Sequence, residues 1–202
     1  MDKKIVILNA SPRKDKYCDT KVKDIINKGF ELTRGNIVDI EQNDYKIINI
    51  YDLNLECCNA CGYCENKKGC RINDDMTDLY KLFDEMDMLV VVSPVYFNSI
   101  PAKFKILVDR LQAVYNSKYK LNDPIIDRSK KRQGVIYLYG GQELTPYQFY
   151  GSLQVVDIFF KAVNTKINNV TCFSNTDSNN PESKLDFITG DDEYLESYYS
   201  YI

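Results

Sequence analysis

The chain has 202 residues, a formal net charge of −3 and an apolar fraction of 44%, which is the composition of an ordinary globular domain. It contains no histidine, so Ser/His triads, Cys/His nucleophile pairs and histidine-ligated zinc are excluded. The acidic balance favours neither a nucleic-acid partner nor an anionic membrane surface, and no apolar run approaches the roughly 20 residues that span a bilayer. We therefore expect one domain over residues 1–202, located in the cytoplasm.

The spacing of apolar residues predicts strands and helices in alternation. Runs of β-branched residues predict buried strands, and apolar residues three and four positions apart predict amphipathic helices between them. The expected strands cover residues 4–9, 45–53, 88–92, 133–139 and 166–173, and the expected helices cover 20–32, 75–86, 101–114 and 146–163. A loop over 174–181 and a short acidic, tyrosine-rich helix with a tail would follow. This order predicts an α/β fold, in which a five-stranded parallel sheet carries helices on both faces.

The first strand ends in a loop with hydroxyl and basic side chains, over residues 9–14. Thr20 is the expected N-cap of the next helix, and a helix N-terminus offers free N–H groups and a positive dipole end. Ser11 and Thr20 would add hydroxyl donors, and Arg13 would add a guanidinium that suits phosphate oxygens. The loop therefore predicts a phosphate-monoester site, with a plain surface turn as the alternative. The glycine pattern of a Walker loop is absent.

Two further strand ends would lie at the same edge of the sheet, where ligands of open α/β sheets bind. The second loop, over residues 93–101, holds adjacent aromatic residues and is stiffened by two prolines, which suits a flat ring rich in heteroatoms. Gly140 and Gly141 follow the fourth strand and would let the backbone approach a ligand closely. Ordinary packing of Tyr96 and Phe97, and a plain glycine turn, are the structural alternatives.

Five of the seven cysteines fall in a polar loop expected over residues 56–74. An odd, clustered set of this kind indicates a metal site or redox chemistry in preference to a disulfide framework. The spacing Cys-x2-Cys-x2-Cys-x5-Cys suits a [4Fe–4S] cluster, because structural zinc sites usually have two separated CxxC pairs. Zinc, free thiols and disulfides are the alternatives. The expected ligands are Cys58, Cys61, Cys64 and Cys70, whereas Cys18, Cys57 and Cys172 have no assigned role and Cys172 is expected to be a buried strand residue.

The run over residues 7–14 resembles the start of the NADPH-dependent FMN reductase group of the flavodoxin-like superfamily. The run over residues 92–102, with Asp109-Arg110 after it, is similar to that group's second flavin loop and following helix. The resemblance implies a flavodoxin-like three-layer sandwich that binds FMN. It implies that Ser11, Arg13 and Thr20 hold the phosphate, that Pro94, Val95, Tyr96, Phe97 and Asn98 hold the ring and ribityl chain, and that Gly140 and Gly141 complete the ring site.

The cysteine spacing, followed by Asp74-Asp75-Met76, is similar to that of the iron–sulfur flavoproteins of the same superfamily. The resemblance implies a [4Fe–4S] cluster that exchanges electrons with FMN, so the first hypothesis is an electron-transfer flavoprotein with a ferredoxin-like donor and a small-molecule acceptor. The second is an NAD(P)H-dependent flavin, quinone or nitro-compound reductase without a cluster. The third is a non-enzymatic, zinc-stapled binding domain. A protruding cysteine loop also predicts a homodimer or homotetramer.

Overall fold

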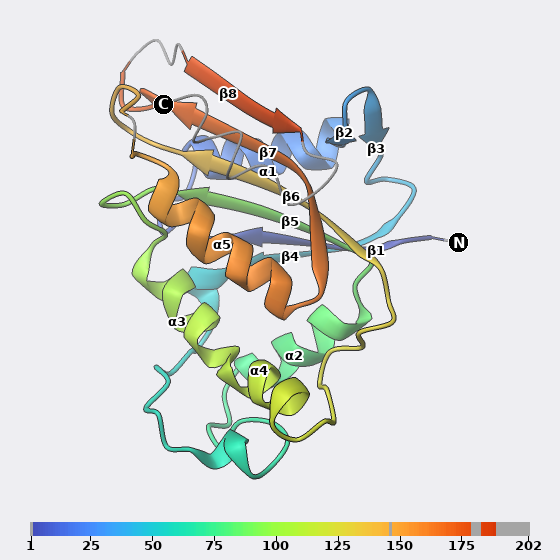
Figure 1. Cartoon of the computed structure of the whole chain (residues 1–202). Coiled ribbons are helices and arrows are strands. Elements are labelled where there is room, and N and C mark those ends of the chain that lie inside the picture. The colour runs from blue at the N-terminus through green and yellow to red at the C-terminus, as the bar shows by residue number, and fades with distance from the viewer. Residues whose placement is uncertain (1, 146, 179–182, 189–202) are drawn as a thin grey trace.

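The centre of the molecule is a six-stranded sheet with the strand order β4-β1-β5-β6-β7-β8 (Figure 1). The computed structural model describes residues 2–145, 147–178 and 183–188. The first five strands in this order are parallel, which confirms the expected five-stranded parallel sheet, and β8 pairs antiparallel to β7. The strands are β1 (Lys4–Asn9), β4 (Asp44–Asn49), β5 (Met88–Pro94), β6 (Arg132–Tyr139), β7 (Thr165–Ser174) and β8 (Ser183–Ile188).

The direction in which the chain moves along the sheet decides which face each helix covers. From β1 the chain steps outward to β4, then crosses back to β5 and continues through β6 to β7. Because such crossovers are right-handed, α1 covers one face and the other helices of the described residues cover the opposite face (Figure 1). The helices are α1 (Tyr17–Lys28), α2 (Met76–Glu85), α3 (Ala102–Arg110), α4 (Gln112–Tyr119) and α5 (Tyr150–Ala162).

Each face of the sheet has its own apolar core. Val6 and Leu8 of β1 pack with the core under α2, α3, α4 and α5, whereas Ile5 and Ile7 pack with the core under α1. This alternation is what a strand buried on both faces requires. None of the helices in the described ranges combines the length and apolar character needed to cross a membrane.

A short antiparallel hairpin, β2 (Phe30–Thr33) and β3 (Asn36–Val38), adds to the α1 layer and was not predicted. The expected helix over 20–32 instead ends before Gly29, where φ is +74°. A Cβ at Gly29 would lie 2.2 Å from the Val38 carbonyl oxygen, so the hairpin needs glycine there. The helical spacing that continues to Phe30 therefore belongs to two elements that share one apolar core.

Three other boundaries differ from the expectation. The helix expected over 101–114 is two helices, α3 and α4, and at the break the Tyr80 hydroxyl donates to the Arg110 carbonyl at 2.7 Å. The strand expected over 45–53 ends at Asn49 and continues as a 3₁₀ turn. The helix expected after residue 181 is wrong for residues 183–188, where alternating polar and apolar residues pair with β7 as an edge strand. Residues 189–202, where the expected helix and tail would continue, lie outside the described residues.

Candidate functional site

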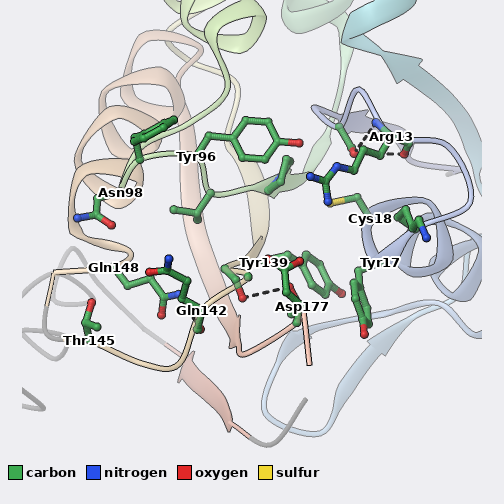
Figure 2. A pocket seen from close by; sticks show the side chains of 18 residues that line it. Arg13, Tyr17, Cys18, Tyr96, Asn98, Tyr139, Gln142, Thr145, Gln148 and Asp177 are labelled. Atoms are coloured by element: carbon green, nitrogen blue, oxygen red, sulfur yellow. Dashed lines mark hydrogen bonds between the residues drawn. The ribbon is translucent and has the colours of Figure 1, made fainter. Parts of the chain in front are cut away.

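A pocket of about 500 Å³ opens at the carboxyl ends of β1, β5 and β6 (Figure 2). The strand order changes direction at β1, and ligands of open α/β sheets bind at that point. The volume lies within the range of small-molecule and cofactor sites. All three predicted loops meet here. The predicted residues that line the pocket are Ser11, Arg13, Pro94, Val95, Tyr96, Phe97, Asn98, Gly140 and Gly141.

The floor of this pocket continues the hydrogen bonding of the sheet. The first residue beyond each of three neighbouring strands donates its backbone N–H to the end of the next strand. The three bonds run from Ala10 N to Val92 O (2.9 Å), from Val95 N to Tyr139 O (2.8 Å) and from Gly140 N to Phe173 O (2.7 Å). Each loop is therefore tied at its first residue to the neighbouring strand as well as to its own.

The first loop is shaped by its own polar side chains. The Ser11 N–H donates to Asn9 Oδ1 at 3.1 Å, and Ser11 Oγ accepts from the Arg13 N–H at 3.1 Å. Both carboxylate oxygens of Asp19 are used inside the loop, since they accept from Asn9 Nδ2 and from the Asp15 N–H, each at 2.7 Å. The loop keeps this conformation through internal bonds, and its backbone curves around one end of the pocket.

Helix α1 begins at Tyr17 with Lys16 as its N-cap, so the prediction of Thr20 as the N-cap is wrong. The Thr20 N–H donates to Lys16 O at 2.9 Å inside the first turn, and its exposed side chain lies outside the pocket lining. Lys16, Tyr17 and Cys18 line the pocket instead. The helix N-terminus beside Arg13 and Lys16 offers N–H groups that have no partner inside the helix, and such a terminus favours anions.

The second loop is a tight turn that presents its tip at the pocket. Tyr96 and Ser99 exchange two backbone hydrogen bonds, of 2.8 and 3.0 Å. Between them Phe97 and Asn98 have φ of +50° and +59°, which is the pattern of a type I′ turn. The Phe97 side chain is fully exposed, so the alternative that it is a packing residue is wrong.

The third loop brings two side chains against its glycines. A Cβ at Gly140 would lie 2.5 Å from Gln148 Nε2, and a Cβ at Gly141 would lie 2.1 Å from Asp177 Oδ2. The loop is also held from the turn after β7, because Thr176 Oγ1 donates to Gly140 O at 3.0 Å. The glycines thus make room for Gln148 and Asp177, which line the pocket. The sequence predicted a different role for them, a close approach of the backbone to a ligand.

Gln148 carries the polar group that most clearly lacks a partner in this pocket. Its Nε2 donates to the Gln142 carbonyl at 3.0 Å, whereas its Oε1 is buried and has no hydrogen-bond partner within the described residues. A buried acceptor left unpaired is costly, so this atom suits the N–H of a bound ligand. The isoalloxazine ring of FMN carries such an N–H. Figure 2 shows Gln148 on the side of the pocket away from Arg13, so the cation and the free acceptor lie at different ends of the pocket.

Cys18 and Tyr139 form an apolar part of the pocket wall. Burial raises the pKa of the Cys18 thiol to about 12, so the thiol is neutral at physiological pH. The Tyr139 ring stacks between Tyr17 and Phe173, with ring centroids 6.2 and 4.7 Å away. Tyr139 and Gln142 flank the two glycines of the predicted third loop, whereas the sequence reasoning assigned no role in the site to Lys16, Tyr17, Cys18, Thr145, Gln148, Thr176 and Asp177. Of these, Thr176 and Asp177 had a usable signal, because they follow a fifth parallel strand that ends at the same edge.

The predicted metal ligands lie in a loop far from this pocket in the fold. Cys57, Cys58 and Cys61 are exposed, Cys64 and Cys70 are half-buried, and all five are free thiols. Across residues 2–145, 147–178 and 183–188, no three cysteine, aspartate, glutamate or histidine side chains are grouped closely enough to hold a metal ion. The predicted ligands are therefore neighbours in one loop but do not form an assembled site.

The donor set of the loop nevertheless fits an iron–sulfur cluster in its chemistry. Ala60, Gly62 and Gly69 have φ of +54°, +71° and +94°, so the backbone reverses sharply between the cysteines. The buried Asn116 of α4 donates from Nδ2 to Cys64 Sγ at 3.2 Å. Hydrogen bonds of this kind to sulfur are among the features that tune iron–sulfur clusters.

A buried ion pair anchors both ends of the cysteine loop. Arg110 Nη1 lies 2.6 Å from Asp74 Oδ2, and it also donates to the Glu56 carbonyl at 2.9 Å. Arg110 Nη2 donates to the Ile72 carbonyl at 3.3 Å, and Asp74 accepts from the Glu56 N–H at 2.8 Å. One side chain of α3 thus fixes the start and the end of the loop, and the cysteines project between these two points.

The model of the NADPH-dependent FMN reductase family matches residues 3–126. The chain belongs to this family. The matched range contains the first and second loops and the cysteine loop, but it ends before Gly140. The part of the pocket formed by the third loop is therefore assigned from geometry alone.

Named relatives are similar over part of their length. An iron–sulfur flavoprotein of Archaeoglobus fulgidus is 31% identical over 112 residues, which are 54% of this chain and 45% of the relative. An iron–sulfur flavoprotein of Methanosarcina thermophila is 28% identical over 124 residues, which are 60% of this chain and 59% of the relative. The alignments thus span about half the length of these relatives.

Among solved structures, the FMN-dependent NADH-azoreductase of Bacillus anthracis in complex with FMN aligns with a TM-score of 0.60 and 17% identity. The alignment covers 98% of this chain and 95% of the azoreductase chain. This likeness shows the shared flavodoxin-like fold over almost the whole chain, and it confirms the predicted fold class.

Proposed function

We propose that the protein is an FMN-dependent oxidoreductase that binds the cofactor at the carboxyl ends of β1, β5 and β6. The observation that carries the proposal is the meeting of three loops around one pocket, with cations at one end and an unpartnered acceptor at the other. When bound, FMN supplies one-electron and two-electron redox chemistry. The chain's own residues bind the cofactor, orient it and exclude water from it.

The two ends of the pocket have different tasks in this proposal. Arg13, Lys16 and the first N–H groups of α1 would hold the phosphate, because charge-assisted hydrogen bonds and the helix dipole both favour an anion there. Tyr96 and the backbone of the second loop would cover the ring, and Gln148 Oε1 would accept a hydrogen bond from its N–H. Thr20 supports the first turn of the helix and contributes only indirectly.

The phosphate assignment is tested by comparing FMN with riboflavin, which has the same ring but no phosphate. We expect the double substitution Arg13→Ala and Lys16→Ala to raise the Kd of FMN at least about tenfold, since each charge-assisted bond contributes about 1.5–3 kcal/mol. The Kd of riboflavin should change less than about twofold. Lys46→Ala, an exposed residue of β4, is the control. Equal losses for both ligands would refute the phosphate assignment, and a wild-type protein that binds neither would refute the FMN site.

We further propose that Cys58, Cys61, Cys64 and Cys70 hold a [4Fe–4S] cluster. The compact spacing, the Asn116 bond to Cys64 and the names of the relatives support this. Anaerobically purified protein should contain iron and sulfide at about four each per chain. Cys61→Ser should abolish both, while Cys57→Ser, which changes a neighbouring exposed thiol, should leave them unchanged. One zinc per chain would favour the zinc-stapled alternative.

An NAD(P)H-dependent reductase without a cluster is the second candidate, and the description of the matching family favours it. It predicts NADPH oxidation with a quinone acceptor that persists unchanged in Cys61→Ser.

For the first candidate we propose a ferredoxin-like donor and a small-molecule acceptor. A homodimer or homotetramer and a cytoplasmic location also remain proposals, which light scattering and cell fractionation would test.

A further inference from the structure

A broad basic hollow of about 870 Å³ lies at the end of the sheet opposite the cofactor pocket. It is bordered by the amino-terminal ends of β6 and β7, the carboxyl-terminal ends of α4 and α5, and the connection before β6. Its lining includes no carboxylate among the described residues, although the chain as a whole is acidic. The cations that line it are Lys118, Arg128, Lys130, Lys131, Arg132, Lys161 and Lys166.

Carboxylates beside the hollow pair with three of these cations. They pair as Lys130–Asp87 (2.8 Å), Arg132–Asp84 (3.1 Å) and Lys161–Asp157 (2.9 Å). Arg128 instead donates to the Ala162 carbonyl at 3.0 Å, and Lys118 donates to the Tyr119 hydroxyl at 2.9 Å. Lys118 and, more weakly, Arg128 lower the pKa of that hydroxyl, which is the effect expected of a positive local potential.

An apolar hollow of about 430 Å³ continues the basic one between α3, α4 and α5. Tyr115 and Ile158 line it and are more than half exposed. Tyr115 and Tyr119 lie one turn apart on α4 with ring centroids at 4.7 Å, so they join the two hollows. An apolar and aromatic centre beside a charged margin, with Tyr and Arg prominent, is typical of protein–protein interfaces.

The same helix also contacts the cysteine loop. Lys120, directly after α4, pairs with Glu65 of the loop at 2.6 Å, and Asn116 donates to Cys64. Helix α4 therefore borders both hollows, through Tyr115 and Lys118, and contacts the cysteine loop, through Asn116. The basic hollow lies at the opposite end of the strands from the cofactor pocket and shares no lining residue with it, so a protein bound there would leave that pocket open for a small acceptor.

We propose that the α4–α5 surface, made of the basic and apolar hollows together, docks a small acidic protein that carries a one-electron centre. The inference rests on the proposed cluster in the cysteine loop. In the transfer step one electron leaves the reduced partner, which is oxidised, and reduces the centre held by the cysteines, while no bond forms or breaks. Charge complementarity selects an acidic protein as the occupant, since opposite surface potentials steer association.

Binding of a purified acidic ferredoxin in its oxidised form tests the surface without any electron transfer. We expect the double substitution Lys118→Glu and Lys131→Glu to raise the Kd at least about tenfold at about 50 mM salt, and the difference to vanish near 500 mM, because salt screens surface charges. Lys28→Glu with Lys46→Glu makes the same change in net charge on α1 and β4, and it should alter the Kd less than about twofold. FMN content and circular dichroism verify the fold of both double variants.

The proposed docking surface is refuted if the ferredoxin does not bind the wild type. It is also refuted if both double variants lose the same amount of affinity for the ferredoxin. A wild-type oligomer that becomes monomeric only in Lys118→Glu with Lys131→Glu also overturns it, because a second copy of the chain then occupies these hollows. Binding that depends on Lys118 and Lys131 supports the surface. If the reduced ferredoxin then binds but fails to reduce the protein in a stopped-flow experiment, the surface stands and the electron-donor part of the proposed function fails.

Discussion

Arg110 Nη1 lies 2.6 Å from Asp74 Oδ2, and neither side chain is exposed to solvent. The pair links α3 to the end of the cysteine loop, and the same guanidinium holds the carbonyls of Glu56 and Ile72. Removal of one partner from such a pair leaves the other charge buried and uncompensated. The pair therefore anchors both ends of the cysteine loop to α3.

Arg110→Ala should lower the free energy of unfolding by about 3–5 kcal/mol, the usual cost of breaking a buried pair. Urea unfolding at pH 7 measures this. Lys105→Ala is the matched control, because Lys105 on the same helix pairs with Asp109 on the surface and such pairs contribute about 0–1 kcal/mol. Equal, small effects of both substitutions would show that the buried pair does not anchor the loop.

Asp74 should also make stability depend on pH. Burial by itself raises the pKa of Asp74, but the Arg110 hydrogen bond and the Glu56 and Met76 N–H groups outweigh it, so the pKa lies below its usual value. A depressed pKa gives stability that is present above the unfolded pKa of about 3.9 and is lost as pH falls through the folded pKa. Between pH 3 and 7 the free energy of unfolding should change less with pH in Asp74→Asn than in the wild type. The same pH dependence in both proteins would contradict the lowered pKa of Asp74.

Gly140→Ala should weaken cofactor binding, because its Cβ would lie 2.5 Å from Gln148 Nε2 and displace that side chain. We expect the Kd values of FMN and riboflavin to rise together, by about fivefold or more if the lost bond is worth about 1 kcal/mol. Gly134→Ala, inside β6, is the control, since its Cβ would meet the Phe160 ring at 2.1 Å. That variant should lose about 1–3 kcal/mol of stability through overpacking and keep its cofactor affinity. Unchanged cofactor affinity in Gly140→Ala, with weaker binding in Gly134→Ala, would place Gln148 outside the cofactor site.

Alkylation of the metal-free protein should separate its thiols by burial. Cys57, Cys58 and Cys61 are exposed and should react with iodoacetamide in the folded state. Cys18 should remain unmodified up to about pH 10, because burial raises its pKa to about 12 and the thiolate is the reactive form. Mass spectrometry of the labelled peptides measures this, and urea-unfolded protein is the positive control. Modification of Cys18 in the folded protein would mean that the first loop opens in solution.

The parallel core of the fold was predictable because its signals are local. The run at Met88 to Pro94 is buried at every residue, and a continuous β-branched run is what such a strand requires. The hairpin after Gly29 was not predictable in the same way, because its strands are short and Phe30 also fits the helical spacing before it. The strand β8 was missed because its acidic surroundings suggested a tail, although its alternation of polar and apolar residues was present.

The residues of the candidate site also differ in whether a local sequence pattern marks them. Ser11, Arg13 and Tyr96 follow strands that the sequence marks clearly, and the structure brings them to one pocket. Gln148 lies in a turn before α5 and reaches the pocket only through the packing of Gly140, so no sequence pattern distinguishes it. For the start of α1 a sequence pattern was present, but it indicated the wrong residue. Thr20 has a favourable residue type for an N-cap, but the helix begins at Tyr17 with Lys16 as its N-cap, and Asp19 in the first turn bonds to Asn9 and to the Asp15 N–H.

The bonds that join Ala10 to Val92, Val95 to Tyr139 and Gly140 to Phe173 have a thermodynamic consequence for a ligand. A site built from free loops loses conformational entropy when it closes on its ligand, and this loss reduces affinity. Here the segments beneath the ligand are already immobilised by the sheet. The remaining freedom lies in side chains at the rim, above all in the exposed ring of Phe97. Binding should therefore order only a few rotamers, and exchange of one flat ligand for another should leave the backbone in place.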